Sequence, residues 1–176
     1  MDEIKVICNL ESGELEVLSD TEPFFCNITN TVRNLDNGWR RRDEIVYATP
    51  EGGKRNTYPI NPQQFPRGNW NIIDVFHIRP ENYKKESEYI EAVNLFGDVV
   101  IRTDAYRDTH VWSIIDGKYG HETPQIIRDS SFWIHCSIYK TSWGCIINPS
   151  KTNQKYLADI CERYLFEVGP IPFSVT

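Results

Sequence analysis

The segment 132–148, FWIHCSIYKTSWGCIIN, contains two apolar stretches separated by a short polar one. Apolar runs of this length, bounded by polar residues, predict strands at 132–136 and 145–148. Because the polar stretch between them is short, we expect the two strands to pair as an antiparallel hairpin that turns near Lys140.

In this hairpin His135 lies directly opposite Cys145. Directly opposed residues share one face of the sheet, with their Cβ atoms roughly 5 Å apart. Cys136 then points to the other face, because side chains alternate along a strand. A slip of one residue would separate the pair, so the prediction that an imidazole and a thiol lie side by side depends on this register.

A cysteine beside a histidine can form a thiolate–imidazolium pair, in which the thiol pKa is lowered and the sulfur becomes a nucleophile. Gly144 would let a substrate backbone approach closely, and the amides around Cys145 would be open as oxyanion donors. Trp143 would form an apolar platform at the rim. The competing interpretation is that the cysteine is buried and inert and that the histidine is simply packed in a strand.

Strand patterns also dominate the rest of the chain. Strands are expected at 3–10, 14–19, 23–29, 70–78, 98–103, 111–115 and 171–175. Polar and apolar residues alternate at 14–17, which favours a half-buried hairpin that turns at Ser12 and Gly13. The charged segment 80–92 predicts a short helix. We therefore expect one mainly β domain over residues 1–176.

One long helix is predicted at about 152–167. Apolar residues at helical spacing form a stripe along it: Tyr156, Leu157, Ile160, Cys161, Tyr164 and Leu165. Ser150 or Thr152 can cap its start, and Gly169 followed by Pro170 ends it. A closing strand follows this C-terminal helix.

The composition narrows the class of protein. The 176 residues carry 25 acidic and 19 basic side chains, a net charge of −6, and 40% of them are hydrophobic. Such values are typical of a soluble globular domain, and the acidic total disfavours a nucleic-acid-binding protein. No apolar stretch suffices for a transmembrane span. The start Met1-Asp2-Glu3 lacks the features of an export signal, so we expect synthesis in the cytosol.

The five cysteines are odd in number and form no CxxC motif. We expect them to be reduced thiols. Three are expected to be core residues: Cys8, Cys26 and Cys161. A zinc site built from His135, Cys136 and Cys145 is disfavoured, because adjacent ligands on opposite faces of a strand fit it poorly. No metal or other cofactor is therefore expected.

Other polar residues suggest weaker candidates. The basic run at 40–42 beside Trp39 could contact an anionic polymer, although a solvated turn is the favoured interpretation for an acidic protein. Three histidines have no evident partner in the sequence: His77, His110 and His121. His110 could reach the cleft from a neighbouring strand, but an ordinary surface or core role is favoured.

His135 followed by the S-x-G-C motif at 142–145 resembles the signature of the L,D-transpeptidase (YkuD-like) catalytic domain. The segment 65–72, FPRGNWNI, is similar to that family's P-x-G-x-[FYW]-x-I strand, and the C-terminal helix and closing strand resemble its last two elements. The resemblance covers about residues 57–176, and residues 1–56 would supply N-terminal strands of the same domain.

The resemblance implies a mainly β sandwich or barrel and cysteine-dependent acyl transfer on peptidoglycan stem peptides. Carried over by position, Cys145 is the nucleophile and His135 the base. Ser142 supports the site, and the amides of Gly144 and Cys145 form the oxyanion hole. The cysteine takes the acyl group of a meso-diaminopimelate or similar residue and releases D-Ala. An amine acceptor then gives a cross-link, and water gives carboxypeptidase or endopeptidase activity.

The chain departs from the family pattern in three ways. Larger members place an arginine where Ile147 stands, so we expect weak recognition of a free terminal carboxylate and a preference for hydrolysis or exchange. The spacing from histidine to cysteine is short, as in compact phage-type and effector-type relatives. An enzyme of the cell wall or periplasm would also need delivery by specialised secretion or lysis. The alternative is a non-catalytic module of the same fold that binds the cell wall or belongs to a phage or a secretion apparatus.

Overall fold

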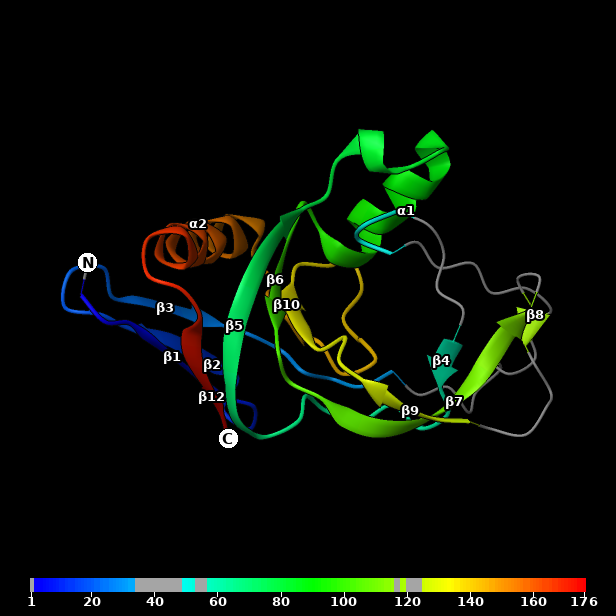
Figure 1. Cartoon of the computed structure of the whole chain (residues 1–176), viewed down its shortest axis with the longest axis horizontal. Coiled ribbons are helices and arrows are strands. Elements are labelled where there is room, and N and C mark those ends of the chain that lie inside the picture. Colours follow the sequence, from blue (N-terminus) through cyan, green and yellow to red (C-terminus); the bar gives the residue numbers. More distant parts are fainter. Residues whose placement is uncertain (1, 34–48, 53–56, 116–117, 120–124) are drawn as a thin grey trace.

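The computed structural model describes residues 2–33, 49–52, 57–115, 118–119 and 125–176. Eight strands of this part form one curled sheet (Figure 1). In spatial order they are β11 (Ile146–Ile147), β10 (Trp133–His135), β6 (Val99–Thr103), β5 (Gly68–His77), β12 (Ile171–Val175), β1 (Lys5–Asn9), β2 (Glu14–Leu18) and β3 (Phe24–Asn27). The expected mainly β fold with a C-terminal helix and a closing strand is confirmed.

The N-terminal hairpin follows the predicted alternation. In β2, Leu15 and Val17 are buried while the residues between and beside them are exposed, because successive side chains of a strand point to opposite faces. The turn places Gly13 at φ +70°, the left-handed region that glycine adopts without strain. The closing strand β12 lies between β1, to which it is parallel, and β5, to which it is antiparallel.

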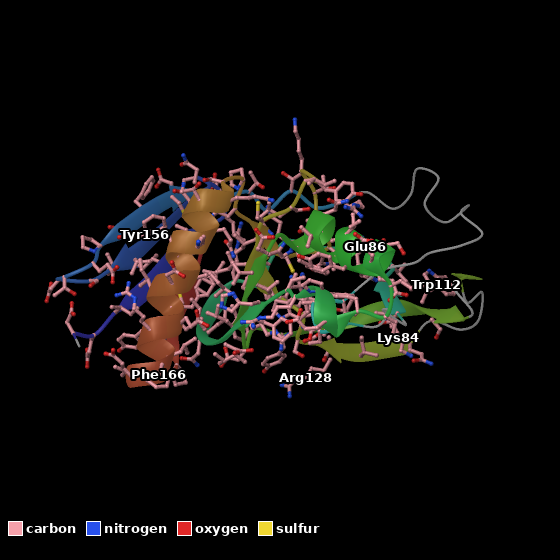
Figure 2. All side chains as sticks on the ribbon, turned by 90° about the horizontal axis from the view of Figure 1, so that it is seen from above. Lys84, Glu86, Trp112, Arg128, Tyr156 and Phe166 are labelled. Carbon is pink, nitrogen blue, oxygen red and sulfur yellow. The ribbon has the colours of Figure 1, made fainter. Side chains whose placement is uncertain are left out.

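The helix α2 (Lys151–Glu167) packs against β5, β6 and β12. The Ser150 hydroxyl caps it by accepting a hydrogen bond from the Asn153 N–H at 3.1 Å, as expected. The buried stripe contains Leu157, Ala158, Ile160, Cys161 and Tyr164. Tyr156, labelled in Figure 2, differs from the prediction because it is 47% exposed. The centre of its ring lies 4.9 Å from that of the Phe24 ring.

A smaller sheet and a second helix lie beyond the main sheet (Figure 1). The strand β7 (Arg107–Ile115) pairs with β4 (Thr57–Pro59), β8 (Lys118–Tyr119) and β9 (Gln125–Asp129). The charged segment predicted to be helical forms a 3-10 turn (Pro80–Asn82) and then α1 (Glu86–Phe96). Neither described helix has both the length and the apolar composition that crossing a membrane requires.

The predicted hairpin between β10 and β11 is wrong. The two strands are parallel, with Ile134 beside Ile146 and His135 beside Ile147. The polar connection does not turn back on β10, because its backbone pairs with a distant part of the chain: Ser142 forms a bridge with Val32. The partner that sets this register lies more than a hundred residues away in sequence and is invisible to local pattern.

The same distant part of the chain joins the two edges of the main sheet. Thr29, which follows β3, and Ile147 of β11 exchange two backbone hydrogen bonds of 2.8 Å. Since β3 and β11 are the edge strands, the bridge pairs edge groups that would otherwise be open to another strand.

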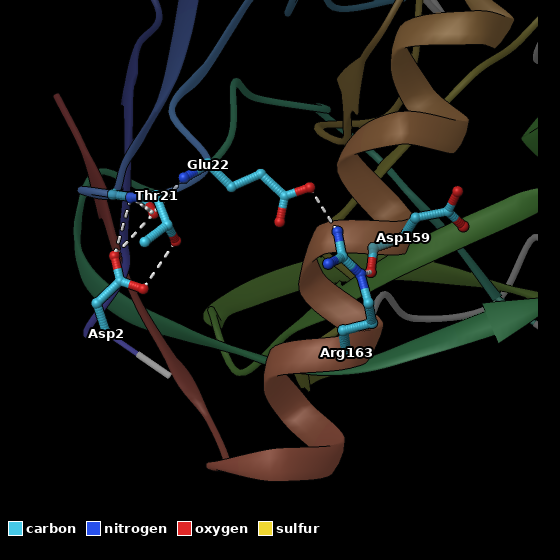
Figure 3. Close-up of polar contacts among 6 residues, drawn as sticks. Asp2, Thr21, Glu22, Asp159 and Arg163 are labelled. Atoms are coloured by element: carbon cyan, nitrogen blue, oxygen red, sulfur yellow. Dashed lines mark hydrogen bonds and ion pairs between the residues drawn. The ribbon is translucent and has the colours of Figure 1, made fainter.

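Polar contacts fasten the N-terminal strands to each other and to α2 (Figure 3). The Asp2 carboxylate accepts hydrogen bonds from the Ser19 hydroxyl, the Asp20 N–H and both the N–H and hydroxyl of Thr21. Glu22 forms an ion pair of 2.6 Å with Arg163 of α2. The turn between β2 and β3 is therefore tied on both sides.

We expect Asp2→Asn to destabilise the protein at neutral pH and not in acid. The hydrogen bond from the Thr21 side chain, with further ones from Ser19 and Asp20, lowers the pKa of the Asp2 carboxyl. A carboxyl whose pKa is lower in the folded state contributes stability above its unfolded pKa of about 4 and loses it as the pH falls through the folded value. Urea unfolding at about pH 7 and about pH 2.5 tests this window.

Asp20→Asn is the matched control, since Asp20 contacts Asp2 through its backbone N–H. An equal loss of stability for Asp2→Asn at both pH values would contradict the prediction.

Candidate active site

Cys145 lies one residue before β11, which places it beside Trp133 at the start of β10. Its Sγ accepts a hydrogen bond from the Trp133 N–H and donates one to the Ser131 carbonyl, each at 3.4 Å. Because Trp133 and His135 are two residues apart on one strand, they share a face of the sheet. Cys145 and His135 therefore share that face as diagonal neighbours of a parallel pair, not as opposed residues of a hairpin.

Both side chains line one cavity, hereafter the Cys145 cavity. It encloses about 740 Å³, the space open to solvent at its mouth included. Its apolar lining comes from Pro50, Leu95, Phe96, Trp133 and Trp143, and its polar lining includes Arg33, Asp129, Ser131, Thr141 and Ser142. A half-exposed thiol and an imidazole thus face a space that a ligand can enter.

His135 is 4% exposed and its ring packs edge-on against that of Phe96, with centroids 5.2 Å apart. Its Nδ1 lies 2.8 Å from the carbonyl oxygen of Cys136. A carbonyl only accepts, so this hydrogen bond places the ring proton on Nδ1 and leaves the lone pair on Nε2.

Burial lowers the pKa of His135 to about 4, against the smaller opposing effect of the hydrogen bond to Cys136. The imidazole is therefore neutral at neutral pH, because desolvation disfavours its charged form. This differs from the expected resting pair of thiolate and imidazolium. The side chain is a proton acceptor held in one tautomer.

Ser142 and Gly144 shape the loop that carries the thiol. The buried Ser142 hydroxyl donates to the Cys145 carbonyl at 2.7 Å and accepts from the Gly144 N–H at 3.2 Å. One of the two amides expected to form an oxyanion hole, that of Gly144, is therefore engaged within the loop itself.

Gly144 is required by the protein's own packing. It has φ +127°, and a Cβ built there would lie 2.7 Å from the Phe132 ring and 2.8 Å from the Gln63 carbonyl oxygen. Both distances are shorter than a side chain tolerates, and they involve a packed ring and a backbone. The space beside Gly144 that a substrate backbone was expected to approach is thus occupied by Phe132 and Gln63.

The sequence did not single out Asn30, the residue that holds this loop in place. Its side-chain nitrogen donates to the carbonyls of Gly144 and Cys145, both at 2.9 Å, and its side-chain oxygen accepts from the Phe65 N–H at 2.8 Å. Asn30 is 5% exposed. No pattern marks it, because its partners lie 35 to 115 residues away.

The other cysteines are buried and Cys145 is half-buried, as expected. Burial raises the pKa of Cys8 and of Cys161 to about 12 and that of Cys26 to about 11. Burial also raises the pKa of Cys136. These four thiols are protonated at neutral pH and shielded from solvent, so Cys145 is the accessible thiol among the five cysteines.

The remaining candidates lie elsewhere. His77 is bonded to Glu162 of α2 at 3.0 Å. His110 and Arg107 line a second cavity. This second cavity and the Cys145 cavity have Trp143 and Asp129 in common. Within the described residues, no three His, Cys, Asp or Glu side chains are grouped so as to hold a metal ion. Three candidates fall outside the described residues: Trp39, the basic run at 40–42 and His121.

Ile147, the position that departs from the family pattern, is 2% exposed and paired with Thr29 in the closing bridge. No family model, curated protein or solved structure matches this chain. The resemblance to L,D-transpeptidases therefore rests on the motif residues themselves.

We expect Asn30→Asp to destabilise the protein by about 2–4 kcal/mol. The substitution keeps the shape of the side chain but replaces the donor to the Gly144 and Cys145 carbonyls with a charged acceptor. Urea unfolding at neutral pH measures the loss. Asn27→Asp, at the exposed end of β3, is the matched control and should change stability by less than about 0.5 kcal/mol. Equal effects of the two substitutions would show that Asn30 does not hold the loop.

Proposed function

We propose that this chain is a cysteine-dependent acyl-transfer enzyme that acts on peptidoglycan stem peptides. One observation carries the proposal: the accessible thiol, Cys145, shares a cavity with a buried imidazole whose Nδ1 donates to a backbone carbonyl. That hydrogen bond directs the basic nitrogen of His135 away from the backbone. The combination of nucleophile and oriented base is the requirement for covalent catalysis.

In the first half of the proposed reaction, the Cys145 sulfur attacks the carbonyl carbon of a peptide bond and its proton passes to Nε2 of His135. The resemblance of the motif implies that the backbone amide of Cys145 stabilises the negative charge that develops on the carbonyl oxygen. The carbon–nitrogen bond then breaks, and the imidazolium returns the proton to the departing amine. The product is a thioester between Cys145 and the acyl group.

In the second half, an amine or a water molecule attacks the thioester. His135 takes one proton from the attacking group and returns it to the sulfur as the carbon–sulfur bond breaks. An amine yields a new peptide bond, and water yields a carboxylic acid. The thiol and the neutral imidazole are regenerated in both cases.

The neutral imidazole suits this sequence of steps. A buried cation would be expensive in the resting site, so the imidazole of His135 stays neutral until a substrate is present. Proton transfer then accompanies attack, and the imidazolium exists only while the substrate excludes water. The choice of stem peptides rests on the resemblance of the motif, and such a substrate would require delivery of the protein to the cell wall or periplasm.

We expect Cys145→Ala to abolish the conversion of muropeptides and His135→Ala to reduce its rate by about 10²–10⁴. Purified peptidoglycan incubated with each variant and analysed by mass spectrometry provides the measurement. Cys136→Ser is the matched control, because it alters the neighbouring buried thiol and keeps the backbone carbonyl that orients His135. Circular dichroism establishes that each variant is folded.

If the wild type and Cys145→Ala convert muropeptides equally, or if neither converts any stem peptide, acyl transfer is excluded. Retention of both proteins on purified cell walls would then favour the non-catalytic binding module.

We expect kcat/KM to keep its value well below the ordinary pKa of histidine and to fall only near pH 4. The base must be unprotonated, and burial lowers the pKa of His135 to about 4 from 6.5. The free energy of unfolding should decline as the pH falls from about 6.5 to about 4, because His135 is protonated in the unfolded chain over this interval and not in the folded chain. A pH–rate profile with a fluorescence check of folding tests this, and half-maximal activity near pH 6.5 would contradict it.

A further inference from the structure

The turn at residues 49–52 forms part of the wall of the Cys145 cavity. Thr49 and Pro50 line that cavity, and Pro50 is buried. The turn is closed on itself, because the Thr49 hydroxyl donates to the Gly52 carbonyl at 2.6 Å and the Gly52 N–H donates to the Thr49 carbonyl at 3.2 Å. It is the short cyan segment beside α1 in Figure 1. Its position therefore decides how far this wall stands from the thiol.

The hydroxyl of Tyr83 holds the turn against a hydrophobic cluster. Its proton is shared between the carbonyls of Thr49 and Pro50, at oxygen–oxygen distances of 2.6 and 2.9 Å. Tyr83 is 9% exposed and belongs to a small core against which Phe96 and Trp133 pack. Since both of those rings also line the cavity, one cluster fixes the turn and two other parts of the cavity wall.

An ion pair between Glu51 and Arg102 of β6 holds the same turn at a second point. The Cζ of Arg102 lies 4.5 Å from the centre of the Phe76 ring and 5.6 Å from that of the Trp133 ring. One of its nitrogens lies 3.7 Å from the Asp74 carboxylate. A single arginine thus contacts both the turn and a ring of the cavity wall, so it helps to set the separation between them.

Gly52 brings the backbone of the turn against the 3-10 turn Pro80–Asn82. Its φ is +97°, and a Cβ built there would collide with the Asn82 carbonyl oxygen. The collision involves backbone and not the end of a flexible side chain. A side chain at this position would therefore push the turn away from the structure that supports it.

We propose that the turn 49–52 is the specificity-determining wall of the Cys145 cavity. Held by Tyr83 and Arg102, it admits slender ligands to the thiol and excludes bulky ones. The natural substrate class rests on the proposed function: among stem peptides, a single unbranched chain is admitted and a cross-linked pair is excluded. Selection by size is a property of the cavity itself and applies to any reagent that reaches Cys145.

Paired alkylation rates of Cys145 at about pH 8 provide the test. Iodoacetamide and an iodoacetamide that carries a naphthyl group on its nitrogen react through the same carbon and differ in width. Changes in the reactivity of the thiol affect both reagents and cancel in the ratio of their rate constants, so the ratio reports how wide a ligand can enter. Burial raises the pKa of Tyr83 to about 12, so its hydroxyl remains a donor under these conditions.

We expect Tyr83→Phe to raise the ratio of the naphthyl reagent to iodoacetamide by about three- to tenfold, as the loss of one hydrogen bond predicts. Glu51→Gln should raise it by about two- to threefold, because the ion pair is partly exposed. Gly52→Ala should raise it as well. Tyr164→Phe, which removes the hydroxyl of a buried tyrosine of α2, is the matched control and should leave the ratio unchanged. Added salt should raise the ratio of the wild type and not that of Glu51→Gln.

Peptide mapping by mass spectrometry separates movement of the turn from unfolding of the chain. When the turn alone moves, the naphthyl reagent modifies Cys145 and not the four buried cysteines. An unchanged ratio for Tyr83→Phe and Glu51→Gln overturns the proposal, and so does a rise in which all five cysteines are modified together. Glu51→Gln, a change at an exposed side chain, decides the matter if Tyr83→Phe does not fold.

A single stem peptide and a cross-linked pair of stem peptides extend the test to the natural substrate. The wild type should favour the single stem in kcat/KM, and Tyr83→Phe should narrow that preference. If neither peptide reacts, the proposed function fails while the alkylation ratio still decides the role of the turn. If both react equally in the wild type, selection by size fails while the proposed function stands.

Discussion

The buried side-chain amide of Asn30 holds together the part of the molecule on which the cavity depends. Its three hydrogen bonds join Phe65, which lies shortly before β5, to the loop that carries Cys145. A buried amide without partners would be costly, so each segment stabilises the position of the others. The loop is fixed by a residue that does not line the cavity.

One extended segment, 29–33, therefore has several roles that its neighbours in sequence would not suggest. Thr29 joins the edges of the main sheet, Asn30 holds the loop, and Arg33 lines the cavity. Because these residues lie within five positions of one another, the same backbone register against Ser142 and Ile147 places all three. A shift of that register would break the bridge between the edges of the main sheet and would also displace Arg33 from the cavity wall. The stability of the fold and the geometry around the thiol are linked in this way.

Local pattern predicted much of the fold. The alternation in β2 and the apolar stripe of α2 arise from side-chain periods of 2 and 3.6 residues, which are properties of short segments. The pairing of β10 and β11 was not predictable in this way, because it depends on a bridge between Val32 and Ser142. A hairpin and a parallel pair both place His135 and Cys145 on one face, so both residues line one cavity although the expected topology was wrong.

The sequence predicted which residues form the site better than it predicted their charge states. The residues His135 and Cys145 can be read from the chain, but the charge of the imidazole depends on its burial against Phe96. Burial is a collective property of residues brought together by the fold. For the same reason Arg33, which stands in a segment without any motif, could be connected with the thiol only through three-dimensional contacts.

The place of β12 has a consequence for how the protein is made. This strand lies between β1 and β5, so the three strands β1 to β3 and the half of the sheet that contains β5 and β6 become continuous only when residues 171–175 are in place. During synthesis on the ribosome these residues are translated after every other strand of the sheet. Pairing between segments so distant in sequence is slow to form, and the nascent chain would expose open strand edges until then. The continuous sheet that carries the thiol is thus completed only after β12 has been translated, and a chain interrupted before β12 would lack it.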